Sequence, residues 1–133
     1  MKWRLVALLG SLVPGLARAQ DPMARAFDLE RRGSYLQAAE IYRTVLQDHP
    51  AEVAALLGLE RALTPVNRNP EMLPAVRAAL ATPQPGATVY GIAVRVYASA
   101  NLLDSLGTLA EAWHRAAPGD ETPYREWAAA ALQ

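Results

Sequence analysis

The stretch 33–50, GSYLQAAEIYRTVLQDHP, restricts the possible folds of this chain more than any other. It begins with Gly33, which suits a tight turn, and it ends with Pro50, which cannot continue a helix. Between them, small and apolar residues recur at steps of three and four, so we predict an amphipathic helix that must bury its stripe against other helices. The stripe consists of Tyr35, Ala38, Ala39, Tyr42, Val45 and Leu46.

The same spacing of helix ends recurs along the chain. Pro50 and Pro118 are 68 residues apart, and the midpoint falls at Gln84, inside a Pro-Gln-Pro-Gly run. A step of 34 residues also carries Tyr90 onto Tyr124. Because three breakers share one spacing, we interpret the chain as a series of similar units.

The order Gly33, Tyr35, Ala38, Tyr42, Pro50 resembles the second half of a tetratricopeptide repeat, a helix-turn-helix unit of 34 residues that stacks on copies of itself. The resemblance implies an all-α, right-handed helical-hairpin solenoid of about three and a half repeats. Those repeats would span 19–52, 53–86 and 87–120, with a half-repeat at 121–133. The weaker matches in the later second helices are Met72, Val76, Ala79 and Leu80, then Leu106, Ala110, Trp113 and His114.

The first helices of the units are less regular. In the second unit, Leu56, Leu59 and Leu63 define one apolar face, whereas a rival register takes Leu57-Gly58 as the pair typical of the family. The segment 88–98 is rich in strand-forming residues, but its apolar positions fall on helical steps and it has no partner strand. In the first unit we expect Met23, Ala26, Phe27 and Glu30 to face inward. Helices are predicted at about 22–32, 35–48, 51–63, 71–82, 87–102, 104–116 and 122–132.

The segment 1–19 has the composition of a secretory signal peptide. Lys2 and Arg4 precede a short apolar run, and Ala17-Arg18-Ala19 places small residues where a signal peptidase reads them. A membrane anchor is disfavoured because a span needs roughly 20 continuous apolar residues. We therefore expect cleavage after Ala19, a mature chain without a membrane span, and a periplasmic or secreted location.

Charge and cysteine content narrow the class of protein. The full chain has 13 basic and 13 acidic residues, so removal of three basic residues with the signal leaves the mature chain mildly acidic. No basic stripe indicates nucleic-acid binding. There is no cysteine, so stability must come from packing rather than from disulfides.

The sequence offers no motif for catalysis, a cofactor or a metal. His49 and His114 have no metal-like spacing to other ligands, and a position near a helix C-terminus accounts for both. Serines lie outside any nucleophile-elbow context. We therefore expect a non-enzymatic scaffold that binds a partner protein in the cell envelope. The alternatives are an accessory subunit of an envelope enzyme or assembly complex and, more remotely, a small helical enzyme.

The resemblance implies that a partner peptide or helix lies along the concave surface of the first helices. Arg61 and Arg95 are one period apart, so two guanidinium groups are expected in one groove, where they would clamp a carboxylate. The alternative is that each arginine is solvated or pairs with a nearby glutamate. Leu57 and Arg125 are further candidate binding residues.

The last predicted helix has no following helix in the sequence to cover it. We expect Tyr124, Trp127, Ala128 and Ala131 to pack back on the third unit and to leave apolar surface exposed on their other side. Exposed apolar patches usually mark an interface. The helix is therefore predicted to pair with its copy in a homodimer or to receive a helix from a partner, unless the reading frame is truncated.

Overall fold

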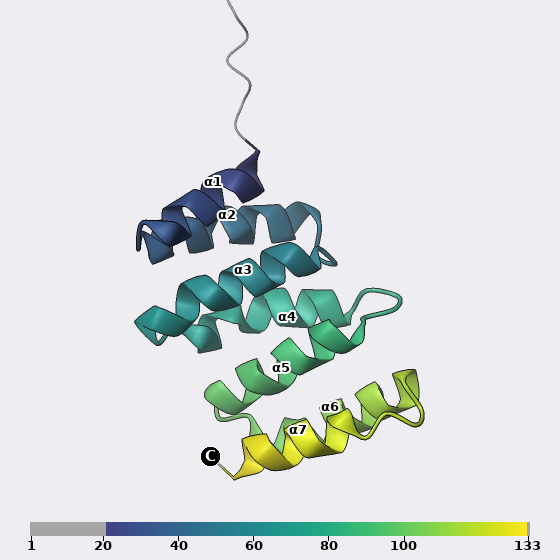
Figure 1. The fold of residues 1–133 in the computed structure, drawn as a ribbon. Coiled ribbons are helices and arrows are strands. Elements are labelled where there is room, and N and C mark those ends of the chain that lie inside the picture. Colours follow the sequence, from purple (N-terminus) through teal and green to yellow (C-terminus); the bar gives the residue numbers. More distant parts are fainter. Residues whose placement is uncertain (1–20, 133) are drawn as a thin grey trace, which may run out of the picture.

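The computed structural model describes residues 21–132, and the predicted signal peptide lies outside them. The described chain is all-α, with seven helices packed as sequential hairpins (Figure 1). Their positions agree closely with the sequence-based prediction, because prolines, glycines and polar turns separate the apolar stripes. The helices are α1 (Pro22–Arg31), α2 (Tyr35–Asp48), α3 (Val53–Leu63), α4 (Leu73–Leu80), α5 (Ala87–Ser99), α6 (Leu103–Ala116) and α7 (Thr122–Ala131).

The hairpins follow one another along a single direction, from α1 at the top of Figure 1 to α7 at the bottom. Each helix packs on its neighbours in the sequence, and α1, α3, α5 and α7 also contact one another in turn. We call these four the first helices and α2, α4 and α6 the second helices. This arrangement brings residues about 30 to 35 positions apart onto the same side of the molecule.

Local sequence explains where the helices begin and end. The Asp21 side chain accepts a hydrogen bond from the backbone N–H of Met23 at 3.1 Å, and Pro22 occupies the first turn of α1. Gly33 between α1 and α2 has φ +76°, a conformation that glycine adopts without strain. These features fix the first hairpin, the part of the chain from which the sequence analysis began.

Helix α5 is buried on almost every side. Of its 13 residues, seven are buried, namely Val89, Tyr90, Gly91, Ile92, Ala93, Val94 and Val96. A helix surrounded by other helices needs apolar residues all around rather than along one stripe. This explains why its sequence resembles a strand, and it confirms the choice of helix.

The second hairpin departs most from the prediction. Helix α4 has 8 residues and begins at Leu73, after the short 3-10 helices Thr64–Val66 and Asn69–Met72. Pro65, Pro70 and Pro74 cluster in this region, and proline removes backbone donors that a longer helix would need. The second hairpin is consequently the least regular of the three.

The core follows the predicted stripes in the second helices and in α3. Ala38, Ala39, Tyr42, Leu56 and Leu59 are all fully buried. Helix α1 differs from the expectation. Phe27 is 51% exposed, whereas Leu29 packs against the core beside Met23 and Ala26. Because α1 has hairpin neighbours on one side only, its apolar residues do not identify a single inward face.

Between residues 21 and 132 the structure contains no helix with the length and apolar character needed to span a bilayer.

Candidate binding groove

Two adjoining hollows of about 700 and 540 Å³ lie along the first helices. They share Asn69 and Arg95, and we call them together the first-helix groove. The groove receives residues from α1, α3, α5 and α7, which lie in succession in Figure 1. Its charged and polar side chains are Glu30, Arg31, Tyr35, Glu60, Arg61, Thr64, Asn69, Arg95, Ser99, Asn101 and Glu126.

Two ion pairs connect successive first helices in this groove. Arg61 on α3 donates from Nε and Nη2 to the two carboxylate oxygens of Glu30 on α1, at 2.6 and 3.1 Å. Arg95 on α5 donates in the same way to Glu60 on α3, at 2.7 and 2.9 Å. Both contacts are bidentate, the geometry in which an arginine binds a carboxylate most specifically.

The two partners of each pair differ in exposure. The side chains of Glu30 and Glu60 are 12% and 17% exposed, whereas those of Arg61 and Arg95 are 50% and 51% exposed. The carboxylates therefore lie beneath the guanidinium groups. The hydrogen bonds to these carboxylates raise the pKa of both arginines, so each remains charged.

Tyr42 links the first pair to the core. Its hydroxyl donates to Oε2 of Glu30 at 2.9 Å, and the residue has no exposed surface. Burial, followed by the hydrogen bond to Glu30, raises the pKa of Tyr42 from 10.0 to about 12. The core side chain of α2 therefore holds the carboxylate that positions Arg61.

Replacing Tyr42 by phenylalanine should lower the free energy of unfolding by about 1–2 kcal/mol, because Glu30 loses a buried donor. The difference should depend on pH. Because the folded-state pKa is raised, the protonated tyrosine stabilises the fold below pH 10, and that stabilisation is lost as pH rises toward about 12. Urea unfolding of both proteins between pH 8 and about pH 12 measures the effect. A constant difference across this range would contradict the assignment.

The structure brings only part of the predicted site together. Arg61 and Arg95 line the same groove, but each pairs with a glutamate, which is the alternative considered for them. Leu57 is half-buried against the core and does not line the groove. Arg125 lies in a separate recess beside His114 and Tyr124, with Nη2 3.4 Å from Oγ1 of Thr122.

Glu30 and Glu60 are the groove residues that the sequence analysis missed. Glu30 was placed among the inward positions of α1, and Glu60 was not singled out. Their partners lie 31 and 35 residues later in the sequence, close to the repeat period of 34. A search for opposite charges one period apart would have found both pairs.

Helix α7 uses a different face from the one expected. Pro123 and Ala130 are its buried residues, whereas Tyr124 and Trp127 are 44% and 39% exposed. Ala131 is also exposed, so the predicted stripe lies largely in solvent rather than against the third hairpin. Tyr124 still contacts His114 on α6, with ring centroids 5.1 Å apart. Pairing of α7 with a second copy through these side chains stays a prediction.

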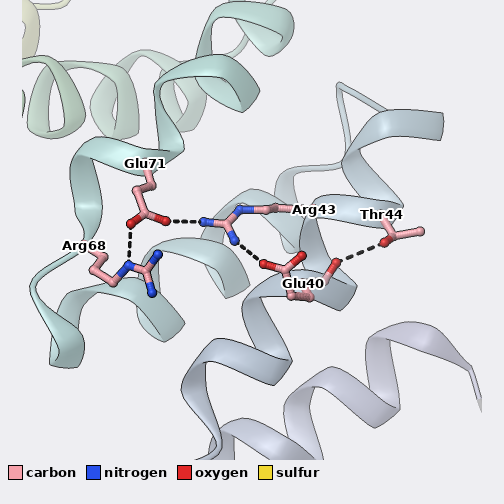
Figure 2. Close-up of polar contacts among 5 residues, drawn as sticks. All are labelled: Glu40, Arg43, Thr44, Arg68 and Glu71. Atoms are coloured by element: carbon pink, nitrogen blue, oxygen red, sulfur yellow. Dashed lines mark hydrogen bonds and ion pairs between the residues drawn. The ribbon is translucent and has the colours of Figure 1, made fainter.

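A second charged cluster lies at the second helices and has the opposite layering (Figure 2). Arg43 on α2 donates to Glu40 and Glu71, and Glu71 also accepts from Arg68. Here the arginine is the deeper partner, since Arg43 is 27% exposed and Glu40 is 72% exposed. Thr44 contributes a hydroxyl bond to the backbone carbonyl of Glu40 at 3.0 Å. Carboxylates thus face outward here, whereas guanidinium groups face outward in the first-helix groove.

In the part of the chain that the structure describes, no group of three His, Cys, Asp or Glu side chains is arranged to hold a metal ion. Comparison with protein-family models, with curated proteins and with solved structures yields no match to this chain. The groove must therefore be interpreted from its own chemistry.

Proposed function

We propose that this chain is a non-enzymatic scaffold of the tetratricopeptide-repeat type, exported to the cell envelope, that holds a segment of a partner protein in the first-helix groove. The observation that carries the proposal is the continuity of the groove. It crosses four helices from three hairpins and α7, so a long segment can contact many units at once. A binding surface of this kind is typical of stacked helical repeats.

Two further features favour a repeat architecture. The ion pairs Glu30–Arg61 and Glu60–Arg95 connect consecutive first helices with the same bidentate geometry. The ring of Tyr42 on α2 also packs against Gly58, the glycine of the rival family register, on the next hairpin. The repeats, the right-handed solenoid and the export of the chain remain parts of this proposal.

Affinity capture from an envelope extract tests the proposal. Tryptophan in place of Ala129, an exposed residue of α7 in the groove wall, should obstruct the groove and abolish capture of the partner. The matched control is Ala116→Trp, since Ala116 is an exposed alanine on α6 outside the groove. Capture that survives Ala129→Trp would count against the groove.

Stoichiometry separates the scaffold from its main alternative, an accessory subunit of an envelope enzyme or assembly complex. A single partner captured in equal amount with the chain would favour the subunit. Several partners, each in lower amount, would favour the scaffold. Quantitative mass spectrometry of the same captured samples gives both readings.

A further inference from the structure

The two arginines of the first-helix groove each retain an unused edge. Arg61 and Arg95 bind their glutamates through Nε and Nη2. Within residues 21–132, neither Nη1 group donates a hydrogen bond. A guanidinium has five N–H donors in a planar fork, so the outer edge of each arginine can still bind a second acceptor.

The net charge of the pairs understates what a ligand would meet. Each pair is neutral, but the carboxylates are shielded beneath the guanidinium groups. Arg31, exposed at the α1 end of the groove, adds a third cation. A ligand approaching from solvent therefore encounters three positive groups before it reaches Glu30 or Glu60.

The positive character is concentrated toward one end. Glu126 on α7 lines the other end of the groove and lies close enough to Arg95 to raise the pKa of that arginine. Arg31 and Arg61 belong to the α1–α3 end, where the hollow contains no carboxylate besides the two shielded ones. The groove is therefore polar along its length, with its cationic part over α1 and α3.

We propose that the first-helix groove selects an extended acidic segment of a partner protein, with carboxylates on the outer edges of Arg61 and Arg95. This inference rests on the function proposed above and names the chemical class of the partner. The ion pairs stay intact when the segment binds, because displacing an arginine would leave a largely shielded carboxylate without its partner. Each guanidinium is then held between two carboxylates, one from the chain and one from the ligand.

The exchange of arginine for lysine isolates the outer edge. A lysine at position 61 or 95 keeps the positive charge beside the glutamate, but it is a point charge without a second planar edge. We expect Arg61→Lys and Arg95→Lys each to weaken an acidic peptide about tenfold, the equivalent of one charge-assisted hydrogen bond. Arg32→Lys is the matched control, because Arg32 pairs with Asp28 on α1 and does not line the groove.

A library of random linear peptides displayed on phage provides the probe. Selected peptides are synthesised, and their affinities for the wild type, both lysine variants, Arg32→Lys and Ala129→Trp are measured by fluorescence anisotropy at low and high salt. We expect peptides rich in Asp and Glu whose binding is lost in Ala129→Trp, weakened in the two groove lysine variants, and reduced by salt. The Arg32→Lys protein should bind as the wild type does.

Two other outcomes separate this inference from the proposed function. Peptides that require an open groove but lack acidic residues, or that bind the lysine variants unchanged, would overturn the acidic specificity and leave the scaffold intact. If no selected peptide is sensitive to Ala129→Trp, both the acidic specificity and the groove fall together.

Discussion

The exchange of Gly58 for alanine is expected to lower the free energy of unfolding by about 3 kcal/mol. A Cβ at position 58 would lie 2.4 Å from Cε1 and Cζ of Tyr42 and 2.8 Å from Cε2. The ring has no room to move, because Tyr42 is fully buried and its hydroxyl donates to Glu30. Relief therefore requires α2 and α3 to separate.

A glycine elsewhere in the fold provides the control. A Cβ added to Gly107 on α6 meets no atom within 4 Å, so alanine there should stabilise the helix by up to about 1 kcal/mol. Urea unfolding followed by circular dichroism gives both values. If Gly58→Ala proves as stable as the wild type, the close contact between Tyr42 and α3 is not present in solution.

The second large effect is expected at Trp113, where alanine should cost about 3–5 kcal/mol. Trp113 is 3% exposed and stacks on Tyr90 of α5, with ring centroids 6.0 Å apart and planes 7° from parallel. Its removal opens a cavity between α5 and α6 and deletes an aromatic contact. In a domain of this size, that is a large share of the total stability.

Trp127 offers a matched comparison on α7. It is 39% exposed, so Trp127→Ala should cost less than about 1 kcal/mol in an isolated chain. Unfolding of both alanine variants at several protein concentrations is the measurement. A loss at Trp127 that equals the loss at Trp113 and grows with concentration would mean that another chain covers α7.

Helix positions were predictable because turns between helices have distinctive residues. Gly33 has a positive φ, and Pro50 stops α2, so punctuation alone placed the first hairpin. Inward faces were predictable only where a helix has neighbours on both sides or one clear stripe. Phe27 in α1 and Trp127 in α7 were assigned inward, and both are exposed because a terminal helix is covered from one side only.

The groove was predictable in part. The repeat period brought Arg61 and Arg95 onto one surface, where the structure places them. Their glutamates were not found, because a contact between helices depends on how each helix is rotated about its axis as well as on spacing. The difference in depth between Glu30 and Arg61 is a three-dimensional property that no pattern in the sequence contains.

The short second hairpin also affects how the molecule comes apart. Helix α4 buries only Val76 and Ala79, so local opening costs less there than in α5. The middle of the stack, rather than its ends, is then the place where the chain divides into two independently fluctuating halves. The Glu60–Arg95 pair joins α3 to α5 across that joint. A segment bound over both arginines would hold the halves together, and it would slow amide exchange in α4 without touching it.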